Sequence, residues 1–300
     1  MFEFEVGDAY ERERALRHER EMQSEDEERR HDDMALQART AYLRMRLGDF
    51  YISNGKVTRA IGEYKRAVKM DGNNAVFRTR LGDSYLLKGL LDQAMAQYRK
   101  AIRVDPELPD PRISLGDLYR RFGMNVQALD QYAVAVRGDP SRAYYRFKLA
   151  DTLQAMGRLE DALEQMLATV ALAPEDPYYR FRLGDLYLKL GRVAEATEEL
   201  AAAAQRAPHD SYYLMRYAIA CLATGRIVQA VDALREAVRM EPHNRCYLVL
   251  LADAYAEAGL EDEAARLLER AGELDSYEME FVGRRRLELT RAENDFAGAA

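Results

Sequence analysis

The word LGDFY begins at Leu47, and related words follow it at a spacing of 34 residues: LGDSY at residue 81, LGDLY at 115, LADTL at 149, LGDLY at 183, YAIAC at 217 and LADAY at 251. No insertion or deletion interrupts the seven copies. A fixed period of this length is typical of stacked helix-turn-helix units, because one helical hairpin cannot bury its apolar face alone. The period therefore predicts an all-α repeat array.

Each unit carries the same signals between two amphipathic helices. Glycine suits the residue just past a helix end, where the chain turns through positive φ, and it recurs at Gly55, Gly89, Gly123, Gly157, Gly191, Gly225 and Gly259. Five residues later the second helix always has alanine, at Ala60, Ala94, Ala128, Ala162, Ala196, Ala230 and Ala264. The first helix keeps a small residue at Gly48, Gly82, Gly116, Ala150, Gly184, Ala218 and Ala252. These small residues predict a close approach of the two helices.

Larger residues and prolines keep the same phase. The second helix offers Tyr64, Tyr98, Tyr132, Met166, Leu200, Leu234 and Leu268 to the contact, and most second helices end at Pro106, Pro140, Pro174, Pro208 or Pro242. Proline cannot continue the helical hydrogen bonding and so predicts the break before the next unit.

With small, aromatic, glycine and proline positions in one register, residues 41–278 resemble the tetratricopeptide repeat family. The resemblance implies an α-solenoid, a right-handed superhelix of seven helix-turn-helix repeats, whose first helices line a concave face that takes partner peptides or helices. One departure is systematic: the family's usual tryptophan early in the first helix is replaced by Arg44, Arg78, Arg112, Arg146 and Arg180, then by Leu214 and Leu248. We expect a slight rotation of the first helix.

Two segments flank the repeats. Residues 279–300 have an apolar side and a charged side and predict a C-terminal capping helix. Residues 1–40 form an arm with thirteen acidic and seven basic residues, which holds nearly all of the formal net charge of −7. Such a charged arm is typical of an exposed helix or a disordered tail. Its start, Phe2 to Val6, alternates with period two, as an extended peptide does when it meets a groove of the same chain, a second copy or a partner.

Composition excludes several functions. An acidic chain does not favour a nucleic-acid partner, which needs clustered Lys and Arg, and no apolar run is long enough for a membrane span. Cys221 and Cys246 lack the spacing of a disulfide framework or a zinc site and fit a reducing cytoplasm. His209 and His243 follow prolines in loops and are interpreted as turn residues. No nucleophile or phosphate-loop motif is present, so we expect no catalysis, no cofactor and no metal.

The candidate site is therefore a partner-binding surface on the first helices. The aromatic words AYYRF, PYYRF and SYYLM place Tyr144, Phe147, Tyr178, Phe181, Tyr212 and Met215 on the face predicted to be concave in repeats four to six. Beside them runs a row of acids that includes Asp49, Asp83, Asp117, Asp151 and Asp185, broken once at Ile219. Bases such as Arg182 stand three residues before several of these acids, a spacing that predicts pairing within one helix. Such pairs are also ordinary on solvated helix faces, where each contributes about 1 kcal/mol at most.

These features predict a cytoplasmic, non-catalytic scaffold or adaptor that holds a partner peptide or helix in the groove. Two alternatives remain: a self-assembling structural subunit that forms a homo-oligomer through residues 1–40, and a targeting subunit of a modular enzyme complex.

Overall fold

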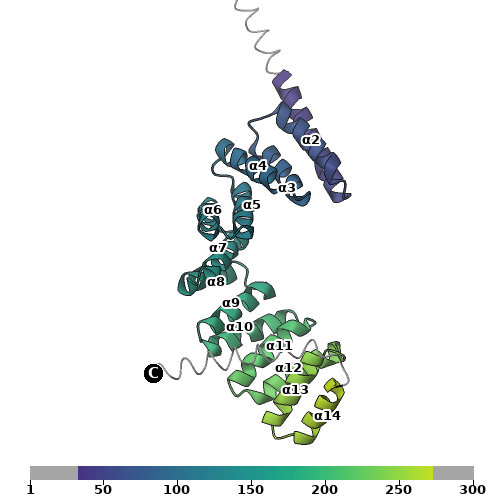
Figure 1. Cartoon of the computed structure of the whole chain (residues 1–300). Helices are drawn as coiled ribbons and strands as arrows, with labels where there is room; N and C mark the ends of the chain where they lie inside the picture. The colour runs from purple at the N-terminus through teal and green to yellow at the C-terminus, as the bar shows by residue number, and fades with distance from the viewer. Residues whose placement is uncertain (1–32, 273–300) are drawn as a thin grey trace, which may run out of the picture. The chain divides into compact units, whose positions relative to one another are not determined.

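The computed structural model describes residues 33–272, and every regular element in this range is an α-helix. A helix over residues 33–53 comes first. It is followed by α2 (Val57–Met70), α3 (Ala75–Leu87), α4 (Leu91–Val104), α5 (Pro109–Arg121), α6 (Asn125–Gly138), α7 (Ala143–Ala155), α8 (Leu159–Leu172), α9 (Pro177–Lys189), α10 (Val193–Arg206), α11 (Ser211–Ala223), α12 (Ile227–Met240), α13 (Arg245–Glu257) and α14 (Glu261–Gly272) (Figure 1). The expected all-α solenoid is confirmed. The capping helix expected at 279–300 and residues 1–32 of the arm lie outside the described residues.

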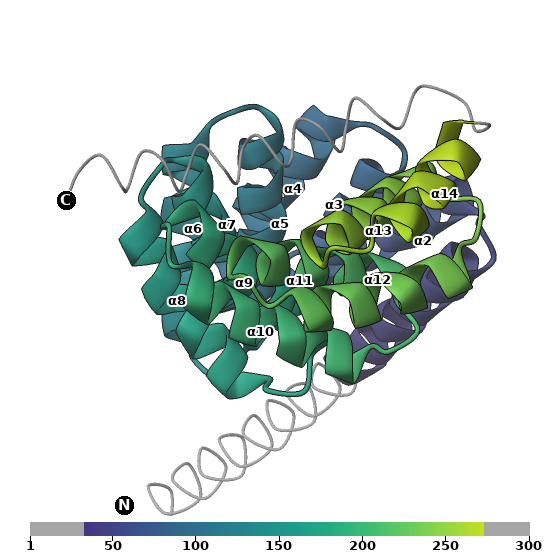
Figure 2. The same ribbon diagram turned by 90° about the horizontal axis from the view of Figure 1, so that it is seen from below.

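The chain divides into two compact units, Met1–Phe122 and Gly123–Ala300. In the first, α2 packs on α3, α3 on α4 and α4 on α5; in the second, the same nearest-neighbour packing runs from α6 to α14. Figures 1 and 2 both show α9 to α14 as successive hairpins that lie side by side. Each hairpin thus buries its apolar face against its neighbours, as the period predicts.

The glycine between the two helices of a repeat has the predicted role. At the end of α3, Gly89 has a φ of 78°, its N–H donates to Leu86 O, and the N–H of Leu90 donates to Tyr85 O. These two bonds form a Schellman motif, which satisfies helix-terminal carbonyls only if the residue after the helix is left-handed. The other six glycines of the series also have positive φ, and among the described residues no non-glycine does.

Small residues do face large ones across each hairpin. A Cβ on Gly82 would stand 2.6 Å from Cε1 of Tyr98, and one on Gly48 equally close to Tyr64. Both tyrosine rings are fully buried. Alanine is found at this position where the second helix carries a slimmer partner, as in the Ala150–Met166 and Ala218–Leu234 combinations. The exception is Gly184, where a Cβ would lie 2.8 Å from Cγ of Leu200.

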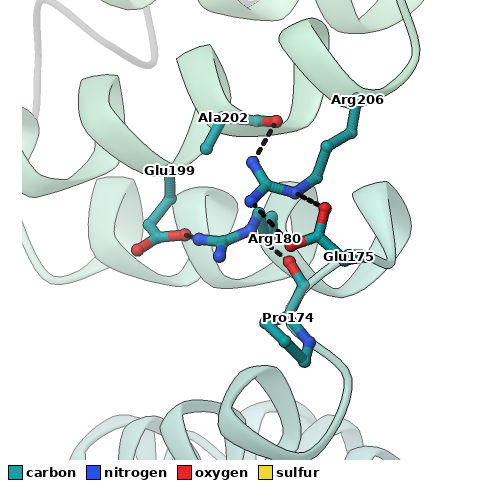
Figure 3. A network of polar contacts seen from close by, with 6 residues as sticks. All are labelled: Pro174, Glu175, Arg180, Glu199, Ala202 and Arg206. Atoms are coloured by element: carbon teal, nitrogen blue, oxygen red, sulfur yellow. Dashed lines mark hydrogen bonds and ion pairs between the residues drawn. The ribbon is translucent and has the colours of Figure 1, made fainter.

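Four of the five arginines that replace the expected tryptophan bind the turn between repeats, whereas Arg44 binds Glu63. Arg180 on α9 donates from Nε to Pro174 O at 2.8 Å and from Nη1 to Glu199 on α10 at 2.9 Å (Figure 3). Beside it Arg206 binds Glu175 and Ala202 O. The same bond to the turn carbonyl is made by Arg78 to Gly72, by Arg112 to Pro106 and by Arg146 to Pro140. Each of these four arginines therefore joins its own first helix to the end of the preceding repeat.

Candidate partner-binding surface

Three tyrosines stand at the start of successive first helices in the second unit. Tyr144 on α7, Tyr178 on α9 and Tyr212 on α11 are 42%, 41% and 40% exposed. Each lies one residue after the first residue of its helix, so one repeat places the same large side chain at the same point of the surface as the next. The structure thus places these three predicted residues where a partner can touch them.

The residues three positions later, which the sequence predicts as partner-binding, are buried. Phe147, Phe181 and Met215 are each only 7% exposed. The ring of Tyr178 meets Phe147 edge-on at 5.4 Å between centroids, and Tyr212 meets Phe181 in the same way at 5.5 Å. These contacts occur because the next first helix covers Phe147 and Phe181, so each phenylalanine lies against an exposed tyrosine of that helix. Such pairs contribute about 0.5–1.5 kcal/mol beyond the burial itself.

Cations lie against two of the three exposed rings, those of Tyr144 and Tyr178. The guanidinium of Arg182 lies 5.2 Å from the Phe147 centroid and 5.8 Å from that of Tyr178, and its Nη1 donates to the Tyr178 hydroxyl at 2.9 Å. Lys148 Nζ lies 5.2 Å from the Tyr144 ring. These are cation–π distances. A partner would therefore meet tyrosines that are already held in place.

The acid and base pairs join neighbouring repeats, which corrects the prediction of pairing within one helix. Arg182 on α9 binds Asp151 on α7 at 2.5 Å, and Arg216 on α11 binds Asp185 on α9. Acid and base are 31 residues apart, because stacking brings consecutive first helices together. Burial acts to lower the pKa of Arg182, but its hydrogen bonds to Asp151 and Tyr178 outweigh this and raise that pKa.

In the first unit, Asp49 and Asp83 of the row accept hydrogen bonds from buried tyrosines. Tyr64 donates its hydroxyl proton to Asp49 at 2.7 Å, and Tyr98 donates to Asp83 at 2.8 Å. Asp49 also lies 3.9 Å from Arg80 of the next repeat, whereas burial raises the pKa of Asp83. Asp117 lies on α5 in the same unit. The sequence contains the signal for this difference between the units. Asp49 and Asp83 stand fifteen residues before Tyr64 and Tyr98, whereas Asp151 and Asp185 stand fifteen residues before Met166 and Leu200, which have no hydroxyl to donate.

Residues 33–272 contain neither a candidate metal site nor a candidate membrane span. No group of three or more His, Cys, Asp and Glu side chains in this range is arranged to hold a metal ion. Nor is any described helix both long and apolar enough to cross a membrane. The candidate surface consists of the exposed tyrosines and of a paired row beside them, the ion pairs Arg182–Asp151 and Arg216–Asp185.

Paired helices that follow one another in a fixed register define a helical-repeat solenoid. The chain belongs to the tetratricopeptide repeat family: models described as tetratricopeptide repeat match residues 41–74, 147–211, 183–243 and 221–276, and one described as TPR repeat matches 82–123. This fold implies a scaffold for protein–protein interaction, and such repeat proteins are generally non-catalytic.

Solved structures share the fold at low sequence identity. A structure from a functional characterisation of Pseudomonas aeruginosa pilF has a TM-score of 0.61 at 17% identity, over 74% of this chain and 99% of that one. A tetratricopeptide repeat protein from Parabacteroides merdae gives 0.56 at 14% identity, over 84% and 99%. YrrB, described as a TPR protein with an unusual peptide-binding site, gives 0.53 at 20% identity, over 62% and 95%. No curated protein matches the sequence.

Proposed function

We propose that this chain is a non-catalytic adaptor that binds an extended segment of a partner protein along the starts of α7, α9 and α11. The observation that carries the proposal is the series Tyr144, Tyr178 and Tyr212, each of which leaves about two fifths of its surface exposed in a rigid setting. Tyrosine is enriched at the energetic centres of interfaces because it offers a large contact area with few rotatable bonds.

The rigidity of these side chains favours binding. The buried rings of Phe147 and Phe181 pack edge-on against Tyr178 and Tyr212, and Arg182 donates a hydrogen bond to the Tyr178 hydroxyl. A surface that is ordered before the partner arrives loses less side-chain entropy on binding. The buried residues of the predicted set thus contribute to binding indirectly, through the tyrosines above them.

The repeat spacing suggests the form of the partner. Packed helices lie roughly 8–10 Å apart, and an extended segment of the polyproline II type advances about 3.1 Å per residue and repeats its side-chain direction about every third residue. A partner segment that crosses successive first helices would present a side chain to a new tyrosine at about every third residue. We therefore propose a partner segment with apolar or aromatic residues at that interval.

The paired row beside the tyrosines limits how much charge a partner segment can carry. Asp151 and Asp185 are already matched by Arg182 and Arg216, so the row offers little net charge. We propose that it selects against a strongly charged segment, whose charges would have to break these pairs. YrrB supports peptide binding as a use of this architecture, since its description names a peptide-binding site.

We place this adaptor in a reducing compartment such as the cytoplasm. The support for this placement is that Cys221 is a free thiol whose pKa is raised by burial, which keeps the thiol protonated and unreactive.

The test is a selection of random displayed peptides on the full chain, followed by affinity measurements on the selected peptides. Tyr178→Ala and Tyr212→Ala should each weaken binding by about tenfold or more, the equivalent of roughly 1.4 kcal/mol. Tyr42→Ala is the matched control, since Tyr42 holds the same repeat position in the first unit and is also exposed. Selected peptides that bind Tyr178→Ala and Tyr212→Ala as tightly as they bind the wild type would contradict the proposed surface.

A further inference from the structure

The first helix of the array has an apolar face that no described residue covers. Leu36, Leu43 and Phe50 are 65%, 59% and 59% exposed, at a spacing of seven residues. Leu47, which is half-buried, lies between the last two. A spacing of 7, 4 and 3 residues places all four on one side of a helix. We call these four residues the N-terminal stripe.

The position of Phe50 is buried in every later repeat, and that of Leu43 is buried in the second repeat. The counterpart of Leu43 in the second repeat is Phe77, which is 4% exposed. The counterparts of Phe50 are at most 2% exposed: Ser84, Leu118, Thr152, Leu186, Ala220 and Ala254. In those repeats the second helix of the preceding unit packs on this side, as α2 does on α3. The first helix has no preceding repeat in the array, and Phe50 is the largest residue of the series.

Charge restricts what could cover the stripe. Arg39 and Arg46 are exposed along one edge of it, and neither forms an ion pair with a described residue. Two copies of this face packed against each other would bring these arginines together, whereas an acidic segment with apolar side chains would match both the stripe and its edge.

Such a segment lies in the same chain. Residues 2–10 contain Phe2, Phe4, Val6 and Tyr10, together with three acids and no base. Residues 11–32 connect them to the helix, and a coil of 22 residues has an end-to-end distance of roughly 26 Å. The stripe from Leu36 to Phe50 is roughly 21 Å long. The connection therefore reaches the whole stripe, at an effective local concentration on the order of millimolar.

We propose that residues 2–10 dock on the N-terminal stripe of their own chain, in the place that the second helix of a preceding repeat would take. The segment acts as an end cap: it covers Leu43 and Phe50 and brings Glu3, Glu5 and Asp8 toward Arg39 and Arg46. This role is separate from the tyrosine surface, which lies in the second unit.

Hydrogen exchange on the full chain tests the proposal. The variant Phe2→Ser/Phe4→Ser/Val6→Ser lies outside the repeats and so leaves their fold intact. Amides of residues 33–53 should exchange about tenfold faster in it, the factor expected when the effective concentration is about ten times the dissociation constant. Phe50→Ser should give the same effect alone, and adding the arm substitutions to it should change little. Val228→Ser, which alters an apolar residue that is 73% exposed on α12, is the matched control.

Sedimentation at low and high protein concentration identifies the source of the segment. Protection of residues 33–53 in a monomer, unchanged on dilution, supports docking within one chain. Protection that disappears on dilution together with a dimer would assign the segment to a second copy and overturn the proposal. Equal exchange in the wild type and the arm variant would also overturn it.

Discussion

Arg216 on α11 pairs with Asp185 on α9, and one repeat later the same two positions hold Leu250 and Ile219. Leu250 belongs to the apolar core of the last repeats, and Ile219 packs against that core. Both members of the pair change from charged to apolar together. The reason is burial: Arg216 is only 7% exposed, and a buried guanidinium without its acid would be costly.

This relationship predicts that the pair can be exchanged as a unit. Asp185→Ile alone should lower the free energy of unfolding by on the order of 3 kcal/mol, because it leaves Arg216 buried and unpaired. Asp185→Ile/Arg216→Leu should recover most of that loss, since it copies the Ile219–Leu250 combination. Urea unfolding of the two variants measures the difference. A double variant no more stable than the single one would show that the two positions are not coupled.

The arginine at the turn between repeats should contribute to stability, unlike an exposed one. Arg180→Ala removes the bonds to Pro174 O and Glu199, in a side chain only 17% exposed, and should cost about 1–3 kcal/mol. Arg158→Ala is the comparison, because the ion pair of Arg158 with Asp161 is about half exposed at both ends and should contribute about 0–1 kcal/mol. Thermal or urea unfolding compares the two; equal effects would mean that the turn carbonyl does not matter.

Two glycine-to-alanine changes should act in opposite directions. Gly82→Ala places a Cβ against the buried Tyr98 ring, and overpacking of this kind costs about 1–3 kcal/mol. Gly62 lies within α2 and has nothing within 4 Å of an added Cβ. Gly62→Ala should therefore stabilise the protein by about 0.5–1 kcal/mol, through the better helix propensity of alanine. Unfolding midpoints that shift in the same direction would contradict this account.

Alkaline pH should destabilise the chain through Tyr98. Burial, and then the nearby Asp83 carboxylate, raise the pKa of Tyr98 above its ordinary value of 10.0. The folded state therefore keeps a proton that the unfolded chain releases, so the contribution of Tyr98 is fully present below pH 10 and is lost as the pH rises further. Tyr98→Phe should make the loss of stability above pH 10 shallower by about 1.4 kcal/mol per pH unit. Unfolding between pH 9 and 11 measures the slope, and an equal slope in the wild type and Tyr98→Phe would contradict this account.

The local signals in the sequence were enough to predict the repeat array. Glycines such as Gly89 require positive φ, and the small residue at Gly82 requires a close helix, so both can be placed without knowledge of the neighbouring repeat. The exposed fraction of each site residue could not be predicted from such local signals. Tyr144 and Phe147 share a helix face, and only the next first helix, which brings Tyr178 and Tyr179 onto Phe147, buries the second and leaves the first exposed.

The ion pairs show the same limit. The spacing of Arg182 from Asp185 suggested a pair within α9, yet Arg182 binds Asp151 of the preceding repeat. Both partners are within reach of a long side chain, and the choice depends on how closely consecutive first helices stack, which is a property of the packed array. The replacement of Asp and Arg by Ile219 and Leu250 was the available clue, because two changes 31 residues apart match only if the repeats pair across their boundary.

Because the acid of one repeat faces the residue 31 positions later, the pairs constrain the order in which units can follow one another. Excision of residues 177–210 would bring Asp151 opposite Arg216, and the new junction would again join an acid to a base. Excision of residues 211–244 would instead set Asp185 against Leu250, a charge against an aliphatic side chain. The array can therefore lose some of its units without a mismatch but not others, and the position of the deleted unit decides whether the new junction is matched in charge.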